Sequence, residues 1–117
     1  MKKILVIGFL LSLVCSCGSK EIQYQKVSTD EAQEIMEKSS YQIIDVREDY
    51  EYQESHVVGS INIPYTEIST ININKDTILF VYCKSGKRSK IAADTLLKMG
   101  YQVYDLGSLD MITLDKE

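Results

Sequence analysis

The residues of this sequence with the clearest chemical potential surround one cysteine. Cys83 is followed by the run Lys84, Ser85, Gly86, Lys87, Arg88 and Ser89. Successive backbone N–H groups in a tight loop that contains glycine form a concave site for an anion. A helix that we expect to begin near Ser89 adds the partial positive charge of its N-terminal end at the same point. Together these features stabilise a thiolate, so we predict that Cys83 is a reactive, catalytic nucleophile.

Charge around this cysteine indicates what it acts on. Lys84, Lys87 and Arg88 are cations, although the whole chain has a net charge of −4. A local cluster of cations attracts and orients an anionic substrate. We therefore take residues 84–89 as the candidate substrate-binding residues.

Three other interpretations of Cys83 fit the sequence less well. A cysteine at the end of a core strand is often inert, but an inert residue needs neither neighbouring cations nor a glycine loop. Cysteine phosphatases place their arginine one residue farther from the cysteine than Arg88, at the position that Ser89 occupies here. Thiol–disulfide exchange requires a second, resolving cysteine, and the mature chain predicted below has none.

The first 16 residues have the pattern of a secretion signal rather than that of a domain. Two lysines precede an apolar run over residues 4–14, as in signal peptides. This run is shorter than the about 20 apolar residues that a membrane-spanning helix needs. We predict that residues 1–16 form a signal peptide.

The end of this segment resembles the lipobox of bacterial lipoproteins, in which a cysteine receives diacylglycerol. Val14, Cys15 and Ser16 precede Cys17, which fits as the lipidated residue, and residues 17–23 fit as a short tether. A signal peptide without lipidation is the alternative. The prediction implies an exported protein that is anchored by lipid to a bacterial membrane and faces the periplasm or the cell exterior.

Lipidation changes the number of free thiols. Of three cysteines, Cys15 would leave with the signal peptide and Cys17 would become a thioether, which leaves Cys83 alone in the domain, residues 24–117. An internal disulfide is then impossible, whereas exported domains usually pair their cysteines. An unpaired thiol in an oxidising compartment supports a chemical role for Cys83.

Composition also excludes some partners. Without Lys2 and Lys3 the mature chain has 11 Lys and Arg against 17 Asp and Glu, a net charge of −6. Such a surface is a poor ligand for nucleic acid, which requires neutralised phosphates. The sequence has no cluster of metal ligands and no nucleotide-binding motif, so we expect neither a metal nor an organic cofactor, and we expect a monomer.

The elements that must position Cys83 alternate between strand and helix. We predict strands at 24–27, 41–46, 61–63, 77–82 and 102–106, a helix at 29–38, a polar turn or short helix at 48–54, and a helix that follows the Cys83 loop and ends before Gly100. This order predicts an α/β fold with a mainly parallel central sheet and helices on both faces. Ligands of such sheets bind at the carboxyl ends of the strands, where Cys83 lies.

Three further residues could line the site, but each has a simpler structural role. Asp45 and Arg47 end a predicted buried strand, and we expect them to form an internal ion pair or a turn contact. His56 is the one histidine and could act as a general base. Its place before a turn with glycine favours a structural hydrogen bond instead.

With these motifs in place, the chain resembles the single-domain rhodaneses from about Val27 to Leu109. Four segments carry the resemblance: Asp45-Val46-Arg47-Glu48 with Glu51-Tyr52; His56-Val57 with Gly59 to Pro64; Cys83 to Ser89; and Leu97, Gly100 and Tyr101 with Val103, Tyr104, Leu106 and Gly107. The six-residue loop from Cys83 to Arg88 has the length typical of sulfurtransferases, whereas phosphatase-like and arsenate-reducing relatives have one residue more. Ser108 stands where the family often has a second glycine, and the chain has no tryptophan, which makes the packing of the last segment a point to examine.

The resemblance implies a sulfurtransferase in which Cys83 carries sulfur as a persulfide. The donor would be a small sulfur-containing anion such as thiosulfate, and the acceptor would be a thiol or cyanide. The competing interpretation is a rhodanese-like module that binds a partner or carries sulfur without turnover. A phosphatase or an arsenate reductase is a more distant alternative.

Overall fold

The computed structural model describes residues 23–117 of the chain. The predicted signal peptide, the lipidation of Cys17 and the tether before Gln23 lie outside the described residues. The elements are, in chain order, α2 (Thr29–Lys38), β1 (Tyr41–Asp45), α3 (Asp49–Glu54), β2 (Ser60–Asn62), the 3-10 helix η1 (Tyr65–Thr70), β3 (Ile78–Cys83), α4 (Lys87–Lys98), β4 (Val103–Ser108) and the 3-10 helix η2 (Leu109–Met111). Within residues 23–117, no helix is both long and apolar enough to cross a membrane.

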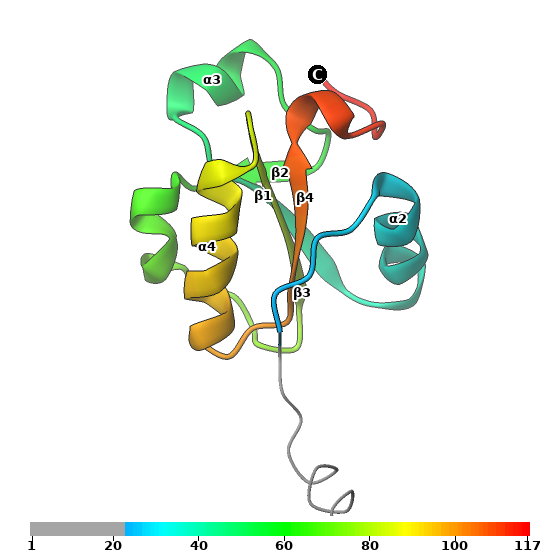
Figure 1. Ribbon diagram of the computed structural model, residues 1–117, viewed down its shortest axis with the longest axis vertical. Helices are drawn as coiled ribbons and strands as arrows, with labels where there is room; N and C mark the ends of the chain where they lie inside the picture. Colours follow the sequence, from blue (N-terminus) through cyan, green and yellow to red (C-terminus); the bar gives the residue numbers. More distant parts are fainter. Residues whose placement is uncertain (1–22) are drawn as a thin grey trace, which may run out of the picture.

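The four strands form one parallel sheet in the order β2-β1-β3-β4. Figure 1 shows α4 and η1 on one side of this sheet and α2 on the other. The predicted α/β fold with a parallel sheet and helices on both faces is therefore confirmed. Parallel strands all end at the same edge, so β3 brings Cys83 to the carboxyl edge of the sheet, at the start of α4.

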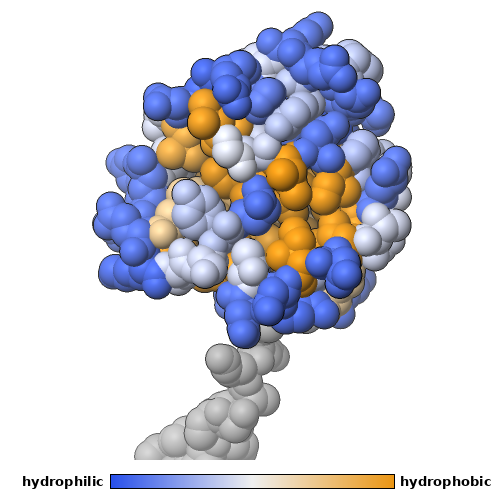
Figure 2. Space-filling view, turned by 180° about the vertical axis from the view of Figure 1, so that it is seen from behind, coloured by the Kyte–Doolittle hydropathy of each residue, from blue (hydrophilic) through white to orange (hydrophobic). Residues whose placement is uncertain are grey.

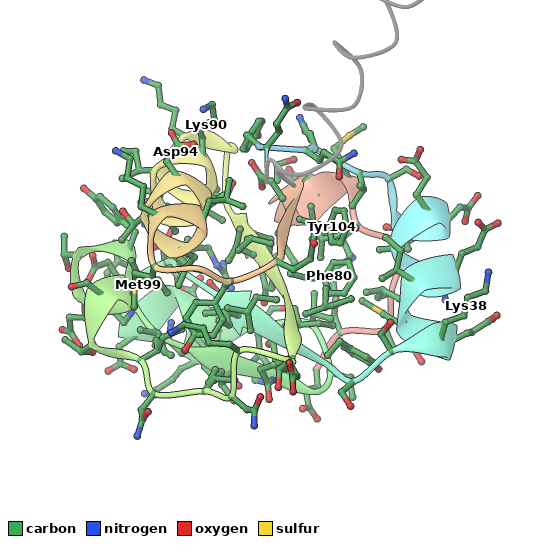
Figure 3. The ribbon with its side chains drawn as sticks, turned by 90° about the horizontal axis from the view of Figure 1, so that it is seen from below. Lys38, Phe80, Lys90, Asp94, Met99 and Tyr104 are labelled. Atoms are coloured by element: carbon green, nitrogen blue, oxygen red, sulfur yellow. The ribbon has the colours of Figure 1, made fainter. Side chains whose placement is uncertain are left out.

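Strand β3 is buried on both faces and divides the core in two. Successive side chains of a strand point to opposite faces. Leu79, Val81 and Cys83 accordingly pack with Ala92, Ala93 and Leu96 of α4, while Phe80 and Tyr82 pack with Ala32 of α2 and Ile112. Figure 3 shows Phe80 and Tyr104 on the side of the sheet that α2 covers. Their rings are stacked, with centroids 5.5 Å apart. Because Cys83 points toward α4, the chemistry of its sulfur belongs to the α4 face.

Local signals explain where the helices begin. Ser28 caps α2 in a reciprocal box: the Ser28 side chain accepts from the Glu31 N–H, and the Glu31 side chain accepts from the Ser28 N–H. Helix α4 begins at Lys87, two residues earlier than the predicted start near Ser89. The reason is Gly86, which caps the helix with a left-handed φ of 97° and so turns the chain directly from the loop into the helix.

The predicted first strand is wrong as a regular element. Within residues 24–27, Lys26 forms only an isolated parallel bridge with Asp105, because the chain turns into the capping box of α2 at Ser28. The segment is nevertheless fixed, since the Tyr24 hydroxyl donates to the buried Asp105 carboxylate at 2.5 Å. The beginning of the domain thus lies along the outer edge of β4.

The C-terminal segment packs well although the chain has no tryptophan. Ile112 is 2% exposed and lies in the core on the α2 side. At the C-terminus, His56 and Glu117 exchange backbone hydrogen bonds of 2.9 and 2.8 Å.

Figure 2 shows apolar side chains near the middle of the face seen from behind, interrupted and surrounded by hydrophilic ones.

Candidate active site

The sulfur of Cys83 lies in a cradle of backbone N–H groups. Cys83 is fully buried at the end of β3. Its Sγ accepts hydrogen bonds from the Gly86 N–H at 3.0 Å and from the Ser89 N–H at 3.3 Å. Ser89 is the third residue of α4, and the first N–H groups of a helix have no partner within the helix. Sγ therefore occupies the place that a capping oxygen takes at other helices.

Two further features hold this loop in shape. The Ser89 hydroxyl donates to the Gly86 carbonyl at 3.2 Å, which ties the helix start back to the loop. Gly86 has its positive φ at the point where its N–H must turn toward Sγ. The structure thus places the N–H groups of Gly86 and Ser89 at the Cys83 sulfur, and their binding of a substrate stays a prediction.

The three cations of the loop have different surroundings. Lys84 and Lys87 are exposed, and within residues 23–117 neither of them forms an ion pair. Arg88 instead forms a two-point ion pair with Glu51 of α3, with Nη1–Oε1 at 2.8 Å and Nη2–Oε2 at 3.2 Å. The structure therefore does not bring all three cations to a substrate in the same way: the two lysines are exposed, and the arginine already has an anionic partner. Ser85 is also exposed.

Glu51 is the residue that the sequence interpretation did not assign to the site. The hydrogen bond from Arg88 lowers the pKa of its carboxyl to about 2 from the usual 4.5, so Glu51 is ionised at neutral pH. Its Oε1 also accepts the Glu48 N–H at 2.9 Å in a capping box at the start of α3. The spacing of Glu48 and Glu51 is a local signal for the cap, but nothing local indicates an arginine 37 residues away.

Asp45 and Arg47 form a buried ion pair of 2.7 Å rather than part of the cradle. The Asp45 carboxylate also accepts the Arg47 backbone N–H at 2.9 Å, and Arg47 Nη2 donates to the Ser55 carbonyl at 2.6 Å. Burial lowers the pKa of Arg47, but hydrogen bonds and charge from Asp45 outweigh burial and raise it. The pair connects the end of β1 with the end of α3, which is the structural role expected from the sequence.

His56 likewise makes structural contacts. Its Nδ1 lies 2.8 Å from the Tyr52 carbonyl oxygen, and its ring stacks on the Tyr52 ring at 3.7 Å. Its Nε2 lies 3.3 Å from the Glu117 carboxylate. Both ring nitrogens thus have partners away from the cysteine, in a contact that joins α3 to the C-terminus.

A neighbouring buried hydroxyl belongs to the same structural network. Tyr82 precedes Cys83 on the opposite face of β3, and its hydroxyl accepts the Val57 N–H at 3.0 Å. Burial raises the pKa of Tyr82 to about 12, so the side chain is neutral at physiological pH. Tyr82 therefore anchors the loop before β2 and offers no proton acceptor to the site.

Access to the sulfur is restricted. Cys83 is 0% exposed, so Sγ is not open to solvent in this structure. A pocket of about 330 Å³ lies at the same end of the sheet, lined by Lys26, Val27, Ser28, Thr29, Leu106, Ser108 and Met111. Leu106, one of the residues that line this pocket, belongs to the core on the α2 side, whereas Cys83 faces α4. This pocket is therefore distinct from the cradle.

Within residues 23–117, no group of three or more metal-ligating side chains is arranged to hold a metal ion.

Comparison with known proteins places this fold and this loop in one family. Residues 28–110 match the model of the rhodanese-like domain, so the chain belongs to the rhodanese-like family. It is 41% identical over 78 residues to the thiosulfate sulfurtransferase PspE of Escherichia coli (strain K12), a match that covers 62% of this chain and 75% of PspE. Its likeness to enzymes named as thiosulfate sulfurtransferases supports sulfurtransferase chemistry in general.

A second relative and a solved structure extend the comparison. The chain is 36% identical over 86 residues to YrkF of Bacillus subtilis (strain 168), whose name proposes a role as a sulfur carrier. The match covers 72% of this chain but only 42% of YrkF. A structure described as rhodanese with anions from E. coli superposes with a TM-score of 0.62 at 37% identity, over 67% of this chain and 98% of that one.

Proposed function

We propose that this protein transfers sulfane sulfur from a small anionic donor to a thiol or cyanide through a persulfide on Cys83. The observation that carries the proposal is the cradle: Sγ accepts N–H groups at 3.0 and 3.3 Å at the carboxyl end of β3. Backbone N–H donors aimed at Sγ can receive negative charge that develops on sulfur during the transfer. Lys84 and Lys87, exposed beside the cradle, supply the positive charge that an anionic donor requires.

The reaction has two balanced halves. The Cys83 thiolate attacks the outer sulfur of thiosulfate, an S–S bond forms on the enzyme, and the S–S bond of the donor breaks with its electron pair leaving on sulfite. The acceptor then attacks the outer persulfide sulfur, and the electron pair of that bond returns to Cys83 as a thiolate. Cyanide yields thiocyanate in this step. Covalent catalysis of this type predicts ping-pong kinetics.

The cradle supports both halves of the reaction because its backbone N–H groups can bind a negatively charged sulfur in each half. Sγ is anionic before the attack and again after the acceptor leaves, and the Gly86 and Ser89 N–H groups point at it. The N–H groups of Lys87 and Arg88 occupy the first helical positions, which have no partner within the helix. They are the groups that we assign to the outer sulfur of the persulfide.

Turnover of thiosulfate and cyanide tests this proposal. Thiocyanate production by the wild-type protein should disappear in Cys83→Ala and in Cys83→Ser, while Asp94→Asn on the outer face of α4 should leave it unchanged. Full turnover in either cysteine variant would refute the persulfide route.

The sulfur-carrier alternative is favoured by one specific observation, the similarity to YrkF. A carrier would accept sulfur on Cys83 but would release it only to a particular partner. It would therefore show one equivalent of bound sulfur after exposure to thiosulfate but no multiple turnover with cyanide or with small thiols such as dithiothreitol. Multiple turnover with either acceptor distinguishes the enzyme from the carrier.

We also propose that the protein is exported and anchored to a bacterial membrane by lipid on Cys17. The lysines, apolar run and lipobox-like end of residues 1–17 support this. Cys17→Ser should abolish incorporation of labelled fatty acid and release the protein from the membrane fraction. Unchanged labelling in that variant would refute the assignment.

A further inference from the structure

We propose that Glu51 is a positioning residue that sets the charge beside Cys83 by holding Arg88 in an ion pair. The inference rests on the proposed function and deepens it, because it specifies which groups remain available to the sulfur donor. In this arrangement the anion is received by the loop amides, Lys84 and Lys87. Arg88 contributes geometry instead of net charge.

The contacts show that the pair is built rather than incidental. Nη1 of Arg88 donates to Oε1 of Glu51, and Nη2 donates to Oε2. This two-point arrangement is the strongest geometry for an arginine–carboxylate pair. The side chains are only 24% and 13% exposed, so solvent competes little with the contact. Glu51 is fixed in turn by the Glu48 N–H, and the carboxylate therefore cannot swing away without breaking the cap of α3.

Arg88 stands directly before Ser89, whose N–H is one of the two that hold Sγ. A change in the charge state of the pair is therefore felt at the sulfur. With the pair intact, the two opposite charges nearly cancel. Removing the Glu51 charge leaves an uncompensated cation in the first turn of α4, and removing the Arg88 charge leaves an uncompensated anion beside it.

The pair also bears on which anions the site accepts. A guanidinium binds a tetrahedral oxyanion best with two parallel N–H bonds. Of the five N–H donors of Arg88, one on Nη1 and one on Nη2 already form such a pair with the Glu51 carboxylate. Among residues 23–117, a phosphoryl or arsenate group would therefore have to compete with Glu51 for Arg88. The site is left suited to donors that present sulfur to the amides and an anionic end to the exposed lysines.

The experiment compares two alkylating agents of the same size and different charge. Iodoacetate is an anion and iodoacetamide is neutral, so the ratio of their rates at Cys83 reports the local electrostatic potential. Thiolate fraction and loop opening affect both rates and cancel in the ratio. Mass spectrometry of the peptide that contains Cys83 measures both rates in the full chain, and neither rate requires sulfur transfer to occur. Failure of this inference and failure of the proposed function are thus distinguishable.

The variants are Glu51→Gln, Arg88→Gln and the double variant, with two controls. The iodoacetate to iodoacetamide ratio should rise roughly two- to fivefold in Glu51→Gln, fall by a similar factor in Arg88→Gln and return near the wild-type value in the double variant. Glu51→Asp keeps the charge and should keep the ratio. Asp94→Asn breaks the exposed Lys90–Asp94 pair on the same helix, on the outer side of α4 in Figure 3, and should also leave the ratio unchanged.

The outcomes that overturn the proposal are equally definite. A purely structural role would change the ratio in neither single variant, or would change it in the same direction in both. A second readout tests the anion preference: inorganic phosphate should protect Cys83 from iodoacetamide at a several-fold lower concentration in Glu51→Gln, where Arg88 is free. Equal protection in the variant and the wild type would show that Arg88 is not withheld from oxyanions.

Discussion

Replacing Gly86 with alanine tests whether the cradle depends on one backbone conformation. Gly86 has a φ of 97°, and a Cβ placed on it would meet no heavy atom within 4 Å. The cost of Gly86→Ala is therefore conformational and not steric. An L-residue in the left-handed region costs about 1–2 kcal/mol, which for a domain of this size corresponds to about 4–8 °C in Tm for each kcal/mol.

The same substitution should have a larger effect on the chemistry. An alanine that relaxes toward negative φ turns its N–H away from Sγ, which now lies 3.0 Å from it. Loss of one donor to a developing or resident anion costs about 10²–10³ in rate at other enzymes. The backbone at position 86 should relax only partly toward negative φ, so the loss should be smaller than this. We therefore expect thiosulfate:cyanide turnover in Gly86→Ala to fall by at least about tenfold.

Gly59 provides a matched control for this prediction. It has a φ of 88° and likewise has no heavy atom within 4 Å of an added Cβ, but it lies in the turn before β2. Urea unfolding should show similar losses of stability for Gly59→Ala and Gly86→Ala, and only Gly86→Ala should lose turnover. Equal turnover in the two variants, or full turnover in Gly86→Ala, would refute the role assigned to the Gly86 amide.

Two further predictions concern the ion pairs around the site. Asp45→Asn leaves the buried Arg47 without its anion, so the free energy of unfolding measured in urea should fall by about 3–5 kcal/mol; a loss below 1 kcal/mol would contradict the assigned role of the pair. Arg88 lowers the pKa of Glu51 to about 2 from the usual 4.5. The pair therefore stabilises the fold fully above a pH of about 4.5, and its contribution is lost as the pH falls from there through about 2. In acid unfolding curves Arg88→Gln should therefore lose less stability than the wild type between pH 5 and pH 2, and parallel curves would contradict this.

Features set by neighbouring residues could be predicted from the sequence. The bounds of α2, residues 29–38, follow from the capping box of Ser28 and Glu31 and from apolar residues at helical spacing. The parallel sheet follows from the alternation of strands and helices, and the place of Cys83 follows from the apolar run of β3 ahead of a loop with glycine. Each of these signals lies within a few residues of the feature that it determines.

Features that depend on distant residues could not be predicted in this way. The bond of Arg88 to Glu51 spans 37 residues, and it changes the interpretation of Arg88 from a substrate ligand to a partner of α3. The isolated bridge of Lys26 with Asp105 depends on the edge of β4, which lies far along the chain. Ile112 is buried in the C-terminal segment, which has no tryptophan. Its burial depends on contacts with side chains of α2 and β3, which lie far from it in the sequence.

The central claim is that Cys83 carries sulfur, and the mass of the peptide that contains Cys83 tests it most directly. After treatment of the full chain with thiosulfate and removal of excess reagent, this peptide should gain the mass of one sulfur atom. Addition of cyanide should then return the peptide to its original mass and release one equivalent of thiocyanate. A Cys83 peptide that gains no sulfur while the protein still converts thiosulfate and cyanide to thiocyanate would contradict the account.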